Sequence, residues 1–227
     1  MGLSSVLNAG FAQGENEGAP TPASDLGHEL PPAQASEACL ATARELQSHG
    51  HAREAIILYE RARQLNPRQK QVSRILAVLY DQQGNDQRAL VEYHKALELT
   101  PRDPDLLNDF GYYYYRRHDW RQAEGYFRKA VAAAPEYERA WVNLGLALGE
   151  QERYQESFDA FAKVVGPAAA HSNVGVILAA HQRPAEAKAA FQRALALQPG
   201  MQQANAFLAT LDAPADNSIR QASGRQN

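Results

Sequence analysis

The sequence predicts an all-α solenoid, in which pairs of antiparallel helices follow one another along the chain. Residues that favour helices (Ala, Leu, Gln, Glu and Arg) dominate the central part, and the alternation of apolar and polar residues that is typical of strands is absent. Prolines recur every 34 residues at Pro67, Pro101 and Pro135, and Pro199 closes a further block. A fixed period of this length indicates tandem repeats of one small structural unit.

The second half of each repeat carries an aromatic residue between two alanines. The spacing is Ala-x3-aromatic-x2-Ala, and each proline follows shortly after it, where a second helix ends and a missing N–H costs little. The four clear copies begin at Ala55, Ala89, Ala123 and Ala187. A weaker copy, Ser157-x3-Phe161-x2-Val164, fills the remaining place in the series.

A small residue stands 16 positions before each of these aromatic residues. The pairs are Ala43 and Tyr59, Ala77 and Tyr93, Gly111 and Phe127, Gly145 and Phe161, and Gly175 and Phe191. This interval holds the second half of one helix, a tight turn and the first half of the next helix. We therefore expect the small residues to let the two helices of a pair approach closely, while the Leu, Tyr and Phe residues fill the space between that pair and its neighbour.

The turns within the pairs carry their own signals. Gly50 and Gly84 mark the first two turns, because glycine accepts the left-handed backbone that ends many helices. His118-Asp119 and Arg183-Pro184 take the same places in later repeats.

One junction is shorter than the others. The distance from an aromatic residue to the next small residue is 18 positions elsewhere but 14 from Phe161 to Gly175. The missing four residues equal about one helical turn. We expect the second helix of the fourth repeat to end early, with Gly166 as its stop. The shortening is compatible both with a tolerated deletion and with a change that shapes a binding surface.

The combined pattern resembles the tetratricopeptide repeat (TPR) family. The phrase Trp141-x2-Leu144-Gly145-x2-Leu148 and the Ala-x3-Phe-x2-Ala-x4-Pro phrase both match that family's signature. The resemblance implies a right-handed superhelix of five repeats with a capping helix at residues 202–212. The repeats would span residues 36–69, 70–103, 104–137, 138–167 and 168–201. The flanking segments 1–35 and 213–227, the first rich in Gly, Pro, Glu and Ala, are predicted to be disordered tails.

Composition narrows the classes of function. The net charge of −3 argues against binding nucleic acid through a broadly basic surface, although a local basic patch is compatible with it. A single cysteine, Cys39, excludes a disulfide framework and a cysteine-rich zinc site. No nucleophile elbow, phosphate-binding glycine loop or HExxH motif is present, and no apolar run is long enough to span a bilayer. We therefore expect no catalysis, no cofactor, no metal and no transmembrane segment.

The resemblance also implies a binding surface. In the TPR family the first helices of the repeats line a concave groove that holds an extended peptide or a partner helix. The residues carried over to this groove are Arg44, Arg74, Asn108, Asp109, Tyr112, Tyr115, Arg116, Arg139, Asn143 and Asn173. Tyr and Arg are enriched at binding hot spots, and an Asn side chain can pair with both groups of an extended backbone.

Within this set, Arg74, Arg116 and Arg139 are candidates for holding a carboxylate. Some TPR proteins hold the terminal carboxylate of a chaperone tail with a fixed Lys, Asn and Arg set. Val78 and Asp109 interrupt that set here, so a chaperone-tail receptor is not expected.

These observations predict a non-catalytic scaffold or adaptor that binds a protein or peptide partner. The alternative is an accessory subunit of a bacterial envelope assembly, such as a pilus or a secretion system. Residues 1–12 lack the basic segment of a secretory signal, which favours the cytoplasm. The stretch from Leu7 to Ala12 also fits the end of a longer signal, which would place the protein in the periplasm or outside the cell.

Overall fold

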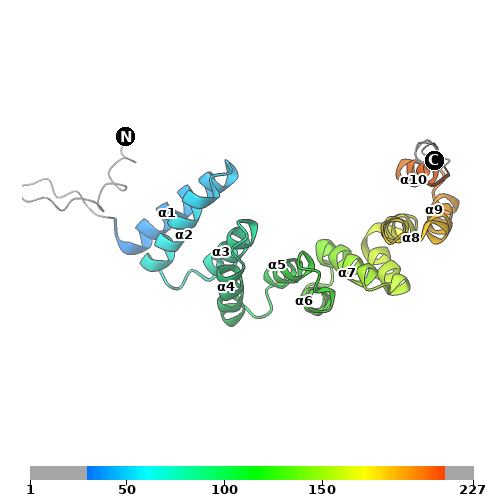
Figure 1. Ribbon diagram of the computed structural model, residues 1–227. Coiled ribbons are helices and arrows are strands. Elements are labelled where there is room, and N and C mark those ends of the chain that lie inside the picture. Colours follow the sequence, from blue (N-terminus) through cyan, green and yellow to red (C-terminus); the bar gives the residue numbers. More distant parts are fainter. Residues whose placement is uncertain (1–29, 213–227) are drawn as a thin grey trace, which may run out of the picture. The chain divides into compact units, whose positions relative to one another are not determined.

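The structure is a computed structural model that describes residues 30–212, and within this range every regular element is a helix. The helices are shown in Figure 1. They are α1 (Pro32–Ser48), α2 (Ala52–Leu65), α3 (Lys70–Gln82), α4 (Asp86–Leu99), α5 (Pro104–Tyr115), α6 (Trp120–Ala133), α7 (Glu138–Glu150), α8 (Tyr154–Ala180), α9 (Pro184–Leu197) and α10 (Gln202–Asp212). The prediction of an all-α fold is confirmed.

The helices pack in chain order, as a solenoid requires. Each helix contacts the next one, and the most extensive contacts join the two members of a pair, such as α1 with α2 and α3 with α4. The first helices of neighbouring pairs also touch, because α3 contacts α5 and α5 contacts α7. Each pair therefore buries its apolar side against the next pair, which is how repeat proteins build a continuous core.

Helix α8 consists of two helices that meet at a break. Gly166 has φ 77° and ψ 166°, a conformation that is essentially restricted to glycine, and Pro167 follows it directly. The first part of α8 (residues 154–165) pairs with α7, and the second part (167–180) pairs with α9. The early stop that the missing four residues predict at Gly166 is thus confirmed.

The turns within the pairs share one backbone conformation. A residue with positive φ stands at each of them: Gly50, Gly84, His118, Glu152 and Gln182. The first two glycines are at the predicted positions. In the last turn the left-handed residue is Gln182, directly before the predicted Arg183-Pro184, and Glu152 carries no glycine-like signal in the sequence.

The first helix begins earlier than predicted, and the last helix lies where a capping helix was predicted. Helix α1 begins at Pro32, four residues before the predicted start of the first repeat. Proline is tolerated there because the first turn of a helix needs no N–H donor. Helix α10 occupies the segment expected to form a cap, and its Phe207 stacks on Phe191 of α9 with ring centroids 5.1 Å apart. The predicted disorder of the tails concerns residues that lie almost entirely outside the described range.

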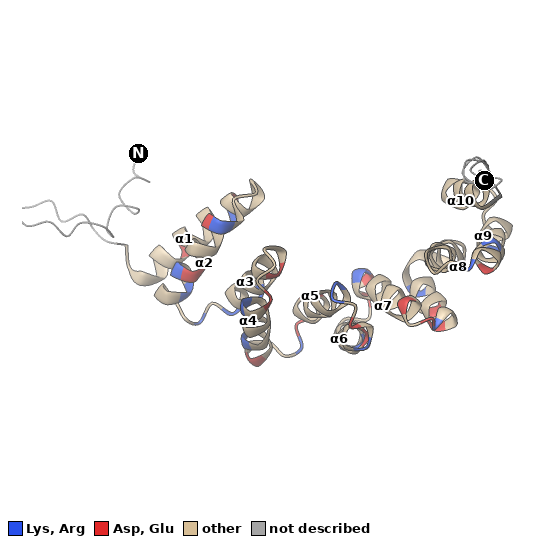
Figure 2. Ribbon diagram, viewed as in Figure 1, with Lys and Arg blue, Asp and Glu red and all other residues tan. Residues whose placement is uncertain are grey.

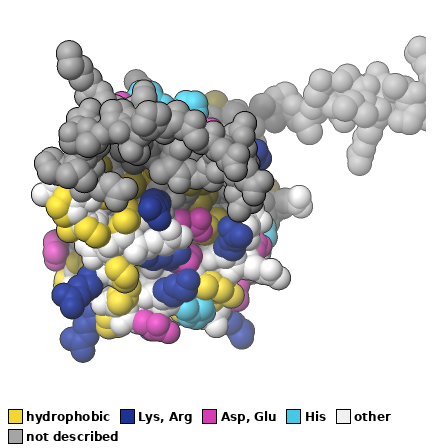
Figure 3. Space-filling view, turned by 90° about the vertical axis from the view of Figure 1, so that its left-hand side faces the viewer, with side chains coloured by type: hydrophobic (Ala, Val, Ile, Leu, Met, Phe, Trp, Pro, Cys, Tyr) yellow, Lys and Arg dark blue, Asp and Glu magenta, His cyan; other side chains and the backbone are white. Residues whose placement is uncertain are grey.

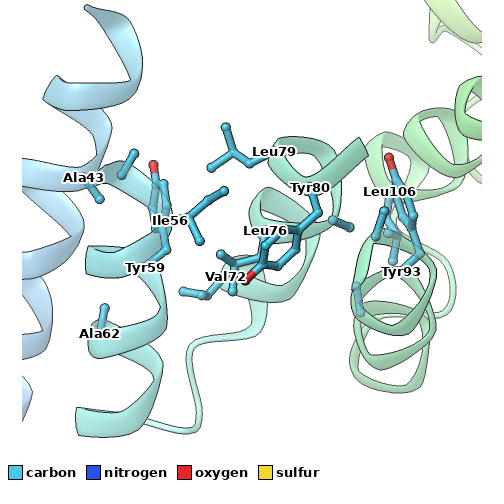
Figure 4. Close-up of a cluster of buried hydrophobic side chains, with 14 of the residues drawn as sticks. Ala43, Ile56, Tyr59, Ala62, Val72, Leu76, Leu79, Tyr80, Tyr93 and Leu106 are labelled. Atoms are coloured by element: carbon cyan, nitrogen blue, oxygen red, sulfur yellow. The ribbon is translucent and has the colours of Figure 1, made fainter. Parts of the chain in front are cut away.

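The core is built on the close approach of small and aromatic residues. A Cβ atom added to Gly111 would lie 2.6 Å from the Phe127 ring, and one added to Gly145 or Gly175 would lie 2.8 Å from the facing phenylalanine. In the first two pairs, Ala43 and Ala77 are fully buried in the equivalent places. Figure 4 shows this N-terminal part of the core, where Tyr59, Tyr80 and Tyr93 lie among aliphatic side chains.

We predict that Gly145→Ala lowers the free energy of unfolding by about 1 to 3 kcal/mol, because the new methyl group collides with the buried Phe161 ring. The control is Gly125→Ala on α6, where nothing lies within 4 Å of the added Cβ. That change should raise the free energy of unfolding by about 0.5 to 1 kcal/mol through helix propensity. Urea denaturation followed by circular dichroism measures both, and equal effects at the two sites would contradict the packing account.

Candidate functional site

The first helices α3, α5 and α7 are joined by polar contacts between residues that lie 35 positions apart. We call the surface that carries them, together with the second part of α8, the inner face. Four contacts share this spacing: Arg74 Nη1 to Asp109 Oδ2 at 3.2 Å, Arg116 Nη1 to Asp81 Oδ2 at 3.3 Å, Asn143 Nδ2 to Asn108 Oδ1 at 2.8 Å, and the Tyr115 hydroxyl to Glu150 Oε1 at 3.4 Å. Each contact joins a position in one repeat to the following position one repeat later.

An ion cluster occupies one end of the inner face. Arg74 Nη1 lies 3.8 Å from Asp105 Oδ2, besides its contact with Asp109. Arg139 Nη2 lies 3.4 Å from Asp105 Oδ1 and 3.6 Å from Asp109 Oδ1. The Tyr137 hydroxyl donates to Asp105 Oδ1 at 2.7 Å. Two arginines therefore face two aspartates, and the cluster has no net charge when all four are ionised.

The cluster changes the acidity of its members. Burial raises the pKa of Asp109 above its ordinary value, against the opposing effect of Arg74 and Arg139. Burial and the hydrogen bond to Asp105 raise the pKa of Tyr137 to about 12. Tyr137 thus stays protonated and keeps donating at neutral pH.

A second group of charges anchors the other end of α3 to α5. Asp81 is buried, and besides Arg116 it pairs with Arg117, whose Nη1 lies 2.9 Å from Asp81 Oδ1. Arg117 also pairs with Asp86 and lies 3.6 Å from the centre of the Tyr113 ring. A buried carboxylate of this kind depends on its cationic partners to offset the loss of hydration.

The three arginines predicted to hold a partner's carboxylate pair with aspartates of this chain in the structure. These are Arg74, Arg116 and Arg139, and their role toward a partner stays a prediction. Asn108 is only 3% exposed and accepts a hydrogen bond from Asn143, so it has little surface to offer a partner. The resemblance to the TPR family implied that these residues share one face, but it did not reveal that they bond to one another.

Three of the sequence-predicted residues form no polar side-chain contact with the described residues. Tyr112 is 46% exposed and stacks on Tyr115 with centroids 6.0 Å apart. Arg44 is exposed and Asn173 is half-buried, and neither side chain has a hydrogen bond or an ion pair with the residues described. By contrast, the Tyr115 hydroxyl donates a hydrogen bond to Glu150. Burial together with that carboxylate raises the pKa of Tyr115 to about 12.

Sequence reasoning missed an apolar row beside these polar residues. Val78, Tyr112, Leu146 and Val176 occupy one position in four consecutive repeats, and we call them the apolar row. Val78, Leu146 and Val176 are half-buried. Asn143 and Asn173 lie one helical turn before Leu146 and Val176, so each amide flanks the row. The recurrence of this position at intervals of 34, 34 and 30 residues was the signal that could have identified the row.

Outside the inner face, the charged residues of the described helices are of both signs. Figure 2 shows basic and acidic residues mixed along the same helices, and Figure 3 shows the same mixture where the surface is not covered in grey. Among residues 30–212 no group of three His, Cys, Asp or Glu side chains is placed to hold a metal ion. No helix in that range combines the length and apolarity needed to cross a membrane.

We predict that Arg74→Met raises the pKa of Asp109 further, because Arg74 lowers it in the native chain. The control is Arg116→Met, which removes an arginine that pairs with Asp81 instead. Carbonyl-detected NMR titration of Asp109 measures the pKa in the three proteins, and an equal pKa in all of them would contradict the cluster. Since the folded pKa exceeds the unfolded one, this group's contribution to the free energy of unfolding falls as the pH rises between the two values.

The tetratricopeptide repeat family matches residues 40–104 and 108–173, and a second description of the same repeat matches residues 168–201. These matches cover well over half of the chain. No curated protein matches it.

Solved structures share the fold at low sequence identity. YrrB, a TPR protein with an unusual peptide-binding site, is 22% identical with a TM-score of 0.57, and the match covers 74% of this chain and 89% of YrrB. PilW, a widely conserved type IV pilus biogenesis factor, is 17% identical with a TM-score of 0.60, over 85% of this chain and 99% of PilW.

A chain of the APC/C hetero-tetramer Cut9–Hcn1 is 22% identical with a TM-score of 0.58, and the match covers 78% of this chain. This chain spans 36% of that longer chain. At these identities the structural matches establish the architecture alone. Together with the family matches and the observed helix pairs, they lead to one conclusion: the chain belongs to the tetratricopeptide repeat family.

Proposed function

We propose that this protein is a non-catalytic scaffold that binds an extended peptide or a partner helix on its inner face. The TPR fold supports a protein–protein interaction scaffold, and members of the family are generally non-catalytic. The observation that carries the proposal is the exposure of Tyr112, a large aromatic side chain of α5 that is 46% exposed. Helix α5 is joined to its neighbours α3 and α7 by polar pairs. Exposed tyrosines in such places are frequent binding hot spots.

The chemistry of the face favours an uncharged or mixed partner segment. The arginines and aspartates of the ion cluster cancel one another, so a purely acidic tail would have to displace Asp105 and Asp109 from their arginines. The apolar row instead offers contact to apolar side chains. Asn173 keeps both its carbonyl oxygen and its amide nitrogen for the backbone of an extended segment.

Binding would require little rearrangement of the face. The contacts between α3, α5 and α7 already fix the rotamers of Tyr115, Asn143 and Arg139 before a partner arrives. A pre-organised surface loses less conformational entropy on binding, which leaves more of the contact energy for affinity.

The direct test is affinity capture from the native cells with three versions of the chain. The first is the wild type, and the second carries Tyr112→Ala with Asn173→Ala. The control carries Ile57→Ala with Val91→Ala, two exposed residues of the second helices α2 and α4. We expect a partner that the wild type and the control retain equally and that the inner-face variant binds at least about tenfold more weakly.

Circular dichroism must first show equal helicity in the three proteins. Equal retention by the inner-face variant would contradict the proposal and move the binding surface elsewhere. Loss in the control variant alone would assign binding to the second helices.

A second candidate function is an accessory role in a bacterial pilus or secretion assembly. Its support is the length of the match to pilus factors: PilW and Pseudomonas aeruginosa PilF each align over 99% of their own chains. We predict on this candidate that the protein isolated from its native cells begins near Gln13, after removal of an export signal. Mass spectrometry of the intact N-terminus decides the point, and a chain that still begins at Met1 or Gly2 would contradict export.

A further inference from the structure

A second concavity lies on the other side of the C-terminal repeats, away from the inner face. It is formed between the first part of α8 and α9, over the second part of α8, and its volume is about 210 Å³. We call it the outer cleft. Its lining includes Tyr154, Phe158, His171, Val174, Leu178 and Arg193.

The floor of the outer cleft is apolar. Val174 and Leu178 are buried beneath it, and the Phe158 ring packs against the His171 ring with centroids 4.4 Å apart. Burial and the nearby Arg193 lower the pKa of His171, so the imidazole is neutral at neutral pH. The inner part of the cleft therefore carries no charge.

The rim has an excess of positive charge. Arg193 is exposed and forms no ion pair with the residues that the structure describes. Glu186 also lines the cleft, but its two carboxylate oxygens accept from Arg183, at 2.7 Å from Nε and 2.8 Å from Nη2. The Glu186 carboxylate of the lining is thus already paired with another arginine.

The equivalent junction one repeat earlier carries different side chains at the positions that line the outer cleft. Where the outer cleft has Phe158, the preceding junction has Glu124, which binds Arg128 and Arg153. Where the cleft has His171, that junction has the larger Trp141, and where the cleft has Ala189 it has Asp159. His171 and Ala189 are smaller than Trp141 and Asp159, and Phe158 replaces the Glu124 carboxylate, so this junction leaves more space and less charge than the preceding one.

The volume limits what the outer cleft can hold. Small-molecule and cofactor sites are usually about 300–1,000 Å³, so a cleft of about 210 Å³ is too small for most of them. It is of the right order for one large side chain. The apolar floor selects an aromatic or aliphatic group, and the unpaired guanidinium on the rim selects a carboxylate beside it.

We infer that the outer cleft is a second binding site, which takes one large apolar side chain of a partner peptide while Arg193 pairs with a carboxylate next to it in that peptide. The site lies between two second helices, the first part of α8 and α9, over the side of the second part of α8 that carries His171, Val174 and Leu178. It does not use Tyr112 or Asn173. It would let the scaffold hold an acidic-hydrophobic segment independently of the inner-face partner.

The test uses three short peptides as probes and the methyl groups of Val174 and Leu178 as reporters in the full-length chain. The probes are acetyl-Phe-Glu-amide, acetyl-Phe-Lys-amide and acetyl-Ala-Glu-amide. We expect the first to shift both methyl signals in NMR titrations with a dissociation constant on the order of 1 mM. The lysine peptide should bind about threefold more weakly or worse, and the alanine peptide should give no saturable shift.

Two variants and a control sharpen the result. Arg193→Ala, an exposed change, should remove the preference for glutamate over lysine, and Ala189→Leu should fill the cleft and abolish the shifts. Tyr112→Ala should bind the first peptide as the wild type does.

Absent methyl shifts, equal binding of the glutamate and lysine peptides, or an unchanged preference in Arg193→Ala would each overturn the inference. Because Arg193→Ala and the peptide comparison need no change in the core, they decide the matter even if Ala189→Leu fails to fold. None of these outcomes bears on binding at the inner face.

Discussion

The contact between a small residue and an aromatic ring within each helix pair is the constraint on which the rest of the structure depends. At Gly111, Gly145 and Gly175 the ring of the facing helix occupies the space where a Cβ would stand. This contact fixes how closely the two helices approach and how they are aligned along their length. Pairs that share this internal geometry can stack on one another in chain order, which brings the first helices α3, α5 and α7 side by side.

The inner face shows how the repeat produces contacts between successive first helices. Polar partners recur at 35 residues, one more than the repeat, so each first helix bonds sideways to the next. In these bonds Arg74, Arg116 and Arg139 pair with aspartates of this chain. On the proposed function, a partner would be recognised by the apolar row, with Tyr112, and by Asn173. Such recognition would depend on shape and hydrogen bonding more than on electrostatic attraction.

The elements that depend on local sequence were predictable, and those that depend on lateral contacts were not. The helix pairs, the close approach of their two helices at Gly145 and the break at Gly166 follow from spacing, because the residues concerned lie within one repeat or at one glycine. The contact of the Phe161 ring with Gly145 was not predicted, since the aromatic residues were expected to pack between one pair and the next. The pairing of Arg74 with Asp109 depends on how two first helices stack, which the period alone leaves open by one position. The outer cleft depends on which side chains are small at a single junction, and no repeat pattern encodes that.

We infer that the glycine and the facing aromatic ring act as one packing unit. A double-mutant cycle tests this inference most directly. Gly145→Ala is measured by urea denaturation in the wild type and in a Phe161→Leu background, with Gly125→Ala measured in both as a reference. A smaller ring-side residue leaves room for the added methyl group, so the account predicts that the cost of Gly145→Ala falls by about 1 kcal/mol or more in that background, while the effect of Gly125→Ala is unchanged. An equal cost of Gly145→Ala in both backgrounds would contradict it.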